Sequence, residues 1–283
     1  MTNVPVYQIK KQICEIGRNI WLRGYCAGNE GNHSVRISDD RVLCTPTGIS
    51  KGMLDAEDIC VVDMDGNQVE KNARGRKRTS EVMVHLAIYK KRPDVKAVIH
   101  SHPPHAVAFC IANLPLPQGI HPEAEVFLGQ TIYAPYATPG GPKLPESFIN
   151  KITAETNTIL MANHGSVSFA KSLMDAYYLL EILDNYCKQL ILARQLGQVN
   201  VLNANQMTEL LQLKERFGMP DSRLACAPQG CASPQEQPFL TTFDGPHPMS
   251  KSCSCEGGGH GAEGDAFEVM VKAITDQIMA GSK

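Results

Sequence analysis

A change of composition near residue 225 sets the strongest limit on how this chain can fold. The chain has 283 residues, and those up to about 224 carry the apolar side chains expected of a globular body. Residues 225–264 are rich in Gly, Pro and Ser and poor in Ile, Val and Leu. Such a segment cannot bury enough apolar surface to offset the conformational entropy lost on ordering. We therefore predict a globular domain over residues 1–224 and a flexible linker over residues 225–264.

Short apolar stretches alternate with helix-type patterns through the predicted globular domain. Strands are expected at residues 41–44, 96–99 and 158–162, with a hairpin over 58–69 that turns at Asp65-Gly66. Helices are expected at residues 5–25, 80–91, 104–112, 171–196 and 205–217. This alternation favours a mixed α/β layer fold.

The last residues, 265–283, carry a separate helical pattern. Their apolar side chains, at positions 267, 270, 271, 274 and 278, have the spacing of one helix face. A helix this short is only marginally stable alone, so its apolar face needs a partner. It could fold back on its own domain, but the preceding linker favours docking of residues 265–280 into a groove of another protein.

Charge and hydropathy exclude several classes of function. The net charge is −2 with no basic block, which leaves no electrostatic basis for nucleic-acid binding. No apolar run has the length of a membrane span, and the N-terminus lacks a signal-peptide pattern. We therefore expect a cytoplasmic protein with its ten cysteines reduced. Four of them cluster near the C-terminus without a clear role: Cys226, Cys231, Cys253 and Cys255.

Three histidines at strand ends form a candidate metal site. His100 and His102 end the apolar strand expected at 96–99, and residues two apart on an extended chain point the same way. His164 ends a second such strand, and Glu81, at the start of a predicted helix, could supply a carboxylate ligand. Three imidazoles with one carboxylate or water make a four-coordinate set that suits zinc.

Two neighbouring histidines have simpler interpretations. His85 lies one turn after Glu81 on the same helix face, and we interpret it as a hydrogen-bonded structural residue. His105 falls inside the next helix, where it would pack or support the site.

Three polar turns could bind an anion. They are Gly31–Ser34, Thr45–Gly48 and the pair Thr79-Ser80, which precedes a predicted helix whose first N–H groups are free. Each is by itself an ordinary turn sequence, and Thr79 or Ser80 could be only a helix cap.

The order of these motifs resembles the class II aldolase/adducin superfamily, specifically its zinc-dependent sugar-phosphate aldolases such as fuculose-1-phosphate aldolase. The resemblance covers about residues 5–218 and rests on EGNHSVRI, CTPTGIS, RTSEVMVHLAIYKKRPDVKAVIHSHPPHA, APYATPGG and LMANHGSVSFAKSLMDAYYLLE. It implies a three-layer α/β/α fold with a mostly antiparallel central sheet. It also implies a homotetramer with active sites at the subunit interfaces.

The resemblance assigns roles to individual residues. It implies that His100, His102 and His164 bind one Zn²⁺ per subunit and that Glu81 is the catalytic acid/base beside the metal. The implied phosphate-binding residues are Gly31, Asn32, Thr47, Gly48, Thr79 and Ser80. A family tyrosine that serves as second acid/base is absent from GIHPEAEVFLG, where Glu123 lies closest and His121 is the other option.

The implied activity is that of a class II, metal-dependent aldehyde-lyase. The expected reaction is retro-aldol cleavage of L-fuculose 1-phosphate or L-rhamnulose 1-phosphate into dihydroxyacetone phosphate and L-lactaldehyde. Alternatives on the same scaffold are a pentulose-phosphate 4-epimerase, a methylthioribulose-phosphate dehydratase and a non-enzymatic adducin-like protein. The C-terminal extension resembles encapsulation peptides, which implies that residues 265–280 bind a shell or core protein in the lumen of a bacterial microcompartment.

Overall fold

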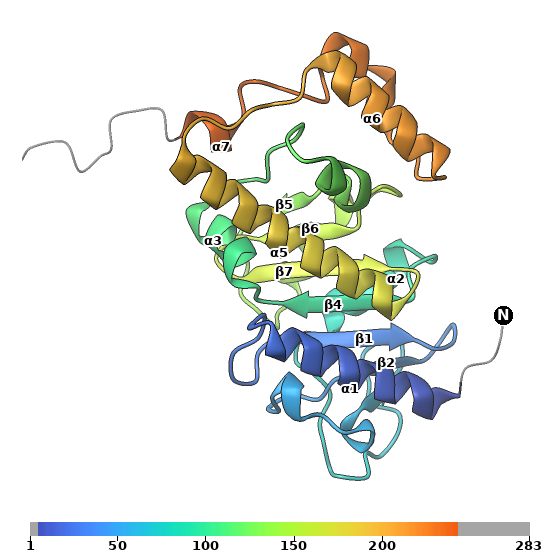
Figure 1. Ribbon diagram of the computed structural model, residues 1–283. Helices are drawn as coiled ribbons and strands as arrows, with labels where there is room; N and C mark the ends of the chain where they lie inside the picture. Colours follow the sequence, from blue (N-terminus) through green and yellow to red (C-terminus); the bar gives the residue numbers. More distant parts are fainter. Residues whose placement is uncertain (1–4, 243–283) are drawn as a thin grey trace, which may run out of the picture. The chain divides into compact units, whose positions relative to one another are not determined.

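A seven-stranded sheet forms the centre of the computed structural model, which describes residues 5–242 (Figure 1). Its strand order is β3-β2-β1-β4-β7-β6-β5. The strands are β1 Asn32–Arg36, β2 Val42–Cys44, β3 Cys60–Val62, β4 Ala97–Ser101, β5 Ile132–Ala134, β6 Thr158–Met161 and β7 Gly165–Ala170. Neighbouring strands run antiparallel except for β5 and β6, which are parallel.

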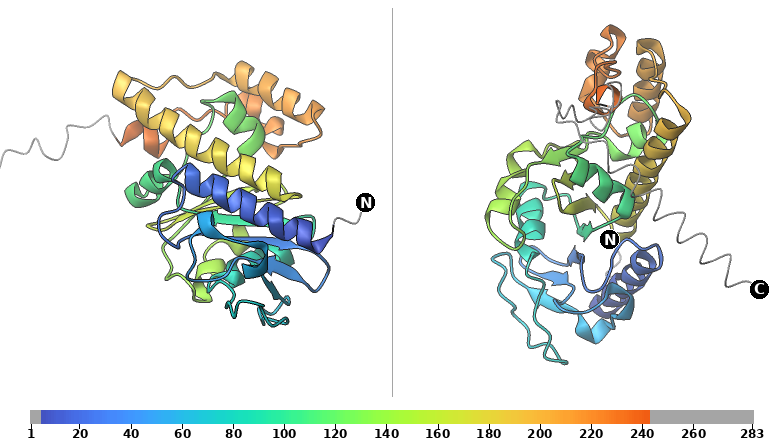
Figure 2. Two further views of the ribbon diagram at one scale, coloured as in Figure 1. Left: turned by 60° about the horizontal axis from the view of Figure 1, so that its bottom comes forward. Right: turned by 90° about the vertical axis from the view of Figure 1, so that its left-hand side faces the viewer.

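Helices cover both faces of this sheet. The helices of residues 5–242 are α1 Val6–Leu22, α2 Val82–Lys91, α3 Pro104–Ala112, α4 Lys143–Glu146, α5 Leu173–Leu196, α6 Ala204–Arg216 and α7 Pro238–Thr241. Of these, α6 packs against residues 124–128 and 222–229 instead of the sheet. Short helical turns are η1 Lys51–Met53, η2 Ala56–Asp58, η3 Ala124–Leu128, η4 Ile149–Lys151, η5 Ser222–Ala225 and η6 Ala227–Gln229. Helices α1 and α5 lie side by side on one face, as Figure 2 shows, and α2 and α4 pack on the other.

The strand periodicity explains this layering. In β4, Ala97 and Ile99 are buried toward α1 and α5, whereas Val98 is buried toward α2. Because successive side chains point to opposite faces, a strand between two helix layers has to be apolar on both. The predicted α/β fold with a mostly antiparallel sheet is therefore confirmed.

The sequence patterns did not predict three of the strands. β1 carries polar side chains at positions 32–34, which the sequence suggested were a turn, yet all three are buried. β7 begins Gly-Ser-Val-Ser, which lacks the bulky alternation of a typical strand. β5 has only three residues. These strands are specified by their neighbours in the sheet rather than by their own propensity.

The first part of the predicted linker is folded. Residues 225–242 contain η6 and α7, a disulfide joins Cys226 to Cys231, and the Phe239 ring stacks on Phe109 with centroids 5.4 Å apart. The predicted start of the linker at residue 225 is therefore too early, because the compact unit extends to Thr242. The disulfide also corrects the expectation that every cysteine is reduced.

The rest of the predicted linker and the docking helix over 265–283 lie outside the described residues, so both stay predictions. Within residues 5–242, no helix is both long and apolar enough to cross a membrane.

Candidate metal centre and active site

The sheet brings the three strand-end histidines to one place. His100 lies on β4, His102 follows that strand, and His164 lies in the turn between β6 and β7. Since β4 pairs with β7, the end of β4 and the start of β7 are adjacent. Gly165 is needed here, because a Cβ at this position would lie 2.5 Å from Cδ2 of His102. The predicted convergence of His100, His102 and His164 is therefore found.

The donor atoms of this histidine cluster are spaced for a single ion. One ring nitrogen from each histidine lies within 4.8 Å of the others, and the Nε2 atoms of His100 and His102 are 3.1 Å apart. Glu81, at the N-terminus of α2, places Oε2 3.2 Å from Nε2 of His100 and Oε1 3.6 Å from Nε2 of His164. Tetrahedral ligands about 2.1 Å from zinc would be about 3.4 Å apart. The residues present therefore fit a zinc-like ion.

Burial and mutual charge set the protonation of this cluster. Burial raises the pKa of Glu81, but the hydrogen bond and charge of His100 and the charge of His164 outweigh it and lower that pKa. Burial and, to a smaller extent, the charge of His100 together lower the pKa of His164 to about 4. Burial and His100 likewise lower the pKa of His102. At neutral pH Glu81 is thus ionised and His102 and His164 are neutral, the forms that bind metals.

Each histidine has a different environment at its other ring nitrogen. Nδ1 of His100 lies 2.9 Å from the carbonyl oxygen of Ser166, and Nδ1 of His102 lies 2.8 Å from Oε2 of Glu30. Nδ1 of His164 is buried and has no hydrogen-bond partner among the described residues. Sequence reasoning missed Glu30, because a contact across 72 positions has no local signal.

A buried network of hydrogen-bonded polar side chains fixes the position of Glu81. Asn32 donates from Nδ2 to Oε2 of Glu81 at 3.0 Å, and its Oδ1 lies 2.5 Å from Nε2 of His85. Nδ1 of His85 contacts the hydroxyl of Ser34, which also contacts the hydroxyl of Tyr89. The interpretation of His85 as a hydrogen-bonded structural residue is therefore confirmed. Asn32, expected in a turn, belongs to β1, and its side chain orients Glu81.

The three predicted anion-binding segments are adjacent. The backbone N–H of Thr79 donates to the carbonyl of Thr45, and that of Thr45 donates to the carbonyl of His33. Gly31 precedes β1 with φ of +74°, and a Cβ there would approach the His100 carbonyl oxygen to 3.1 Å.

The individual residues of this predicted phosphate cradle differ in exposure. Thr47, Gly48 and Ser80 are exposed, whereas Thr79 is buried and accepts from the Glu81 N–H at 3.3 Å. The phosphate-binding roles of all these residues stay predictions.

Glu123, the predicted second acid/base, contacts His121 rather than the histidine cluster. Glu123 precedes η3, and its Oε2 is 3.3 Å from Nδ1 of His121. His121 also packs on the ring of Tyr186. Within residues 5–242, neither Glu123 nor His121 contacts the histidine cluster of its own subunit. His105 is likewise engaged elsewhere, 2.8 Å from Asp184.

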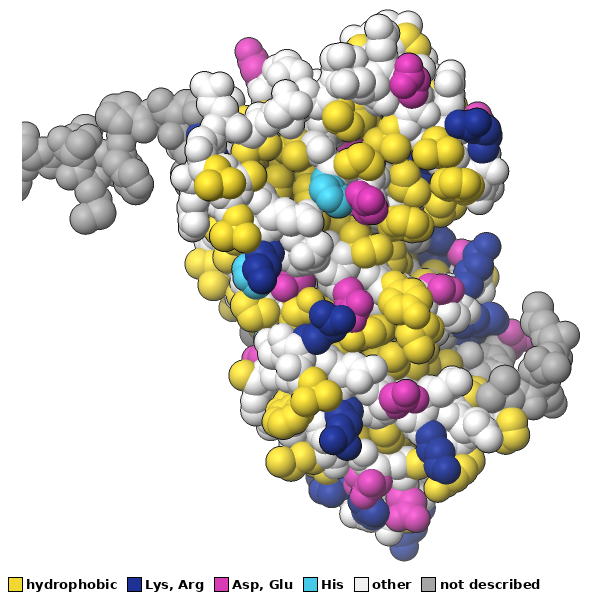
Figure 3. Space-filling view, in the orientation of Figure 1, with side chains coloured by type: hydrophobic (Ala, Val, Ile, Leu, Met, Phe, Trp, Pro, Cys, Tyr) yellow, Lys and Arg dark blue, Asp and Glu magenta, His cyan; other side chains and the backbone are white. Residues whose placement is uncertain are grey.

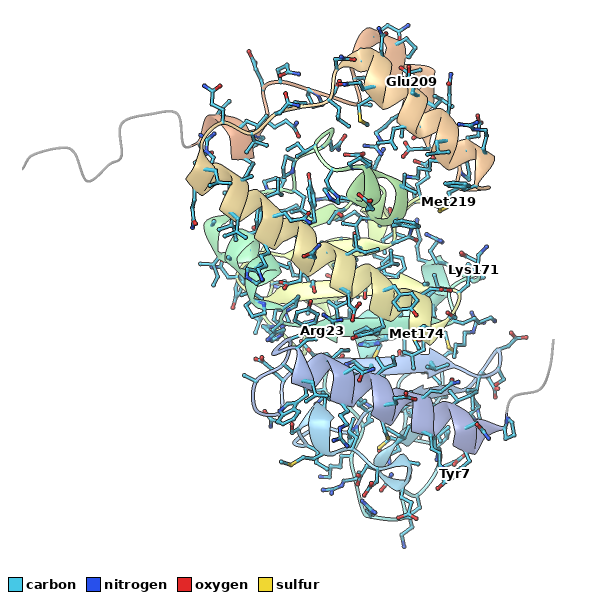
Figure 4. The ribbon with its side chains drawn as sticks, in the orientation of Figure 1. Tyr7, Arg23, Lys171, Met174, Glu209 and Met219 are labelled. Carbon is cyan, nitrogen blue, oxygen red and sulfur yellow. A yellow bond between two sulfur atoms is a disulfide. The ribbon has the colours of Figure 1, made fainter. Side chains whose placement is uncertain are left out.

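An apolar hollow lies on the outer side of α5. It has a volume of about 540 Å³, and its lining includes Phe127, Tyr178, Leu179, Ile182 and Met219. Figure 3 shows apolar side chains gathered on this face. In Figure 4, Met174 and Lys171 mark the start of α5 and Met219 the turn after α6. None of the lining residues belongs to the histidine cluster.

Comparison with known proteins places the chain in a family. Residues 11–191 match the Class II Aldolase and Adducin N-terminal domain. The chain is 38% identical over 183 residues to a 3-oxo-tetronate 4-phosphate decarboxylase from Haemophilus influenzae, covering 63% of this chain and 85% of that protein. It is 36% identical over 183 residues to an L-fuculose phosphate aldolase from Methanocaldococcus jannaschii, covering 65% of this chain and 96% of that protein.

A solved structure agrees with these relatives. An L-fuculose 1-phosphate aldolase superposes with a TM-score of 0.67 at 28% identity, over 77% of this chain and 100% of that one. The aldolase and decarboxylase names of these relatives are consistent with an enzyme of the class II lyase type. The chain belongs to the class II aldolase and adducin family.

Proposed function

We propose that the chain is a zinc-dependent lyase that cleaves L-fuculose 1-phosphate or L-rhamnulose 1-phosphate into dihydroxyacetone phosphate and L-lactaldehyde. The observation that carries the proposal is the convergence of three imidazoles within 4.8 Å of one another beside the buried carboxylate of Glu81. His100, His102 and His164 would hold the ion. When bound, it would supply Lewis-acid stabilisation of the negative charge that develops on substrate oxygen atoms.

Glu81 is positioned to move a proton at the carbon that loses its bond. Asn32 donates to Oε2 of Glu81, which fixes the carboxylate, while Oε1 is buried without a hydrogen-bond partner among the described residues. A desolvated carboxylate with a free oxygen is suited to exchange a proton with a carbon acid. The adjacent segments around Gly31, Thr47 and Ser80 would hold the substrate phosphate through their N–H and hydroxyl groups.

A subunit interface would complete this reaction. Retro-aldol cleavage also requires a base for the hydroxyl of the departing aldehyde, and the contacts of Glu123 and His121 do not join them to the cluster of their own subunit. We therefore propose that Glu123 or His121 reaches the site of a neighbouring subunit in a homotetramer. The exposed apolar side chains of α5, with Tyr178 at 52% exposure, support burial of this helix between subunits.

Decarboxylation of a 3-oxo acid phosphate is the second candidate. The 38% identity to a 3-oxo-tetronate 4-phosphate decarboxylase favours it. Loss of CO₂ from such an acid leaves the same enediolate as the retro-aldol step. It needs one proton, which Glu81 would take up from water and deliver to that carbon, but no second base, which agrees with the single carboxylate next to His100 and His164.

One set of incubations separates these functions. The purified protein, loaded with Zn²⁺, is given L-fuculose 1-phosphate, L-rhamnulose 1-phosphate, L-ribulose 5-phosphate or a 3-oxo-tetronate 4-phosphate. Release of dihydroxyacetone phosphate with L-lactaldehyde supports the aldolase, and release with CO₂ supports the decarboxylase instead. An epimer of the pentulose phosphate, or no turnover of any substrate, would contradict both.

The predicted targeting helix needs its own test. We propose that residues 265–280 bind a shell or core protein of a bacterial microcompartment, on the basis of their helical apolar spacing alone. A fluorescent reporter fused to residues 262–283 should form foci in cells that assemble the compartment. A reporter that stays diffuse in those cells would contradict the proposal.

A further inference from the structure

We infer that Glu30 is a positioning residue for the metal centre, one that fixes the tautomer and ring orientation of His102. Oε2 of Glu30 lies 2.8 Å from Nδ1 of His102, and the two side chains are 34% and 20% exposed. The inference deepens the proposed function and depends on the metal centre described there. It concerns how the ion is held, not which sugar phosphate is cleaved.

The chemistry of the contact determines which ring nitrogen is free. An ionised carboxylate only accepts hydrogen bonds, so Nδ1 of His102 has to donate. In a neutral imidazole the other nitrogen, Nε2, then keeps its lone pair. That atom lies 3.1 Å from Nε2 of His100, inside the histidine cluster. Glu30 therefore selects the tautomer whose lone pair faces the ion.

The three histidines differ in how their outer nitrogen is supported. His100 has the backbone carbonyl of Ser166 at 2.9 Å, which no side-chain substitution can remove. Nδ1 of His164 has no partner among the described residues. His102 is thus the member of the cluster whose orientation can be tested by changing a single supporting side chain. Loss of such a support commonly weakens metal binding 10- to 100-fold.

Glu30 also has a purely structural contact, which must be separated from the first. Its Oε1 accepts the backbone N–H of Ala27 at 2.6 Å and so closes the turn that leads into β1. A Glu30→Gln variant can keep this bond through its amide oxygen. Its NH₂ group then takes the place of Oε2, donates to Nδ1 of His102 and moves the ring proton to Nε2. That tautomer has no lone pair for the ion.

The test measures Zn²⁺ affinity by competition with a chromophoric chelator, starting from metal-free protein. Glu30→Gln and Glu30→Ala should each bind Zn²⁺ about 10- to 100-fold more weakly than wild type. The Co²⁺ absorption spectrum should change in both, because the geometry of the ligands changes. The control, Glu15→Gln, alters an exposed carboxylate on α1 and should bind as wild type does. The melting temperature of metal-free Glu30→Gln should match wild type.

Wild-type affinity and spectrum in Glu30→Gln would overturn the inference, since the turn contact alone would then explain Glu30. If Glu30→Gln lowers the melting temperature of the metal-free protein, the Zn²⁺ affinity of Glu30→Asp is measured as well, because this variant keeps a carboxylate. A variant that retains only acceptor oxygens must bind Zn²⁺ more tightly than Glu30→Gln for the inference to stand. A wild-type protein that binds no metal would overturn the metal centre itself, which is a separate outcome.

Discussion

Two buried clusters of charged side chains in this molecule differ in whether they are complete. The histidine cluster joins Glu81 to three imidazoles at the end of the central strand β4 and the start of β7. The second, here called the salt-bridge cluster, consists of Glu125, Lys214, Asp221 and Arg223, each less than 8% exposed. Arg223 pairs with Glu125 at 2.8 Å and with Asp221 at 2.7 Å, and Lys214 pairs with Asp221 at 2.7 Å.

The difference lies in what remains unpaired. The salt-bridge cluster has two cations and two carboxylates, and every charge has an opposite partner inside the protein. In the histidine cluster, Oε1 of Glu81 and Nδ1 of His164 are buried without hydrogen-bond partners among the described residues. One ring nitrogen from each of the three imidazoles lies within 4.8 Å of the others. A cluster whose charges are all paired inside the protein needs no ligand, whereas a cluster that needs a cation from outside is a binding site.

Removing a metal ligand should break the histidine cluster most completely. His100→Ala takes away the central imidazole, so Zn²⁺ affinity should fall by more than about 100-fold, beyond the cost of losing an outer support. Turnover should be lost with the metal. Metal content after dialysis checks this, with His105→Ala as the control because His105 contacts Asp184 instead. Full zinc retention by His100→Ala would refute the assignment.

Replacing the carboxylate should separate binding from turnover. Glu81→Gln leaves all three imidazoles in place, so the metal should be retained. It removes the group that handles the proton, and turnover should fall about 10²- to 10⁴-fold. Steady-state rates measured at a confirmed metal content test the split. A fully active Glu81→Gln variant would contradict the catalytic role.

The salt-bridge cluster should respond in the opposite way. Asp221→Asn leaves Lys214 and Arg223 buried with one carboxylate between them, which should lower the free energy of unfolding by about 3–5 kcal/mol. Metal affinity should be unchanged. Urea unfolding followed by circular dichroism measures the loss, and Asp39→Asn, which changes a fully exposed carboxylate, should have almost no effect. An equal response of the two variants would mean that the cluster is not structural.

His33 offers a smaller test of what burial without a partner costs. It is fully buried, and neither ring nitrogen has a hydrogen-bond partner among the described residues. Burial holds its pKa well below 6.5, and the charges of Lys51, His85 and His100 lower it further. His33→Leu should therefore raise the free energy of unfolding at pH 7 by about 1–2 kcal/mol.

The pH dependence of the free energy of unfolding provides a second test of His33. Below pH 6.5 the unfolded chain binds a proton at His33 and the folded chain does not, so acid favours unfolding by up to about 1.4 kcal/mol per pH unit. His85, whose pKa burial and His100 lower to about 3, acts in the same direction. His33→Leu should reduce the slope of unfolding free energy against pH by about one proton. An unchanged slope between pH 6.5 and 4.5 would contradict the account.

The two clusters also show what could be predicted from sequence. The histidine cluster was predictable because strand ends and a two-residue spacing encode where His100, His102 and His164 point. The fold class followed from alternating helices and strands. The salt-bridge cluster could not be predicted from the sequence, since Glu125 and Arg223 are 98 positions apart and are brought together only by the fold.

The linker boundary predicted from composition, at residue 225, was wrong. Residues 225–242 have few branched apolar side chains, but Phe239 and Leu240 are buried and Gln237 donates to the carbonyl of Gln118 at 2.9 Å. One buried aromatic side chain, one buried aliphatic side chain, one disulfide and a few hydrogen bonds are enough to order a short segment against an existing core. A window average of hydropathy does not detect such sparse contacts.

A zinc titration of metal-free protein, followed by turnover, tests the central claim most directly. We predict that one equivalent of Zn²⁺ per chain restores release of dihydroxyacetone phosphate from a sugar-phosphate substrate. Further zinc should add nothing, and the Asp221→Asn variant should follow the same curve below its unfolding temperature. Turnover that persists in metal-free protein, or a wild type that binds no zinc, would contradict the assignment of the histidine cluster as the catalytic metal centre.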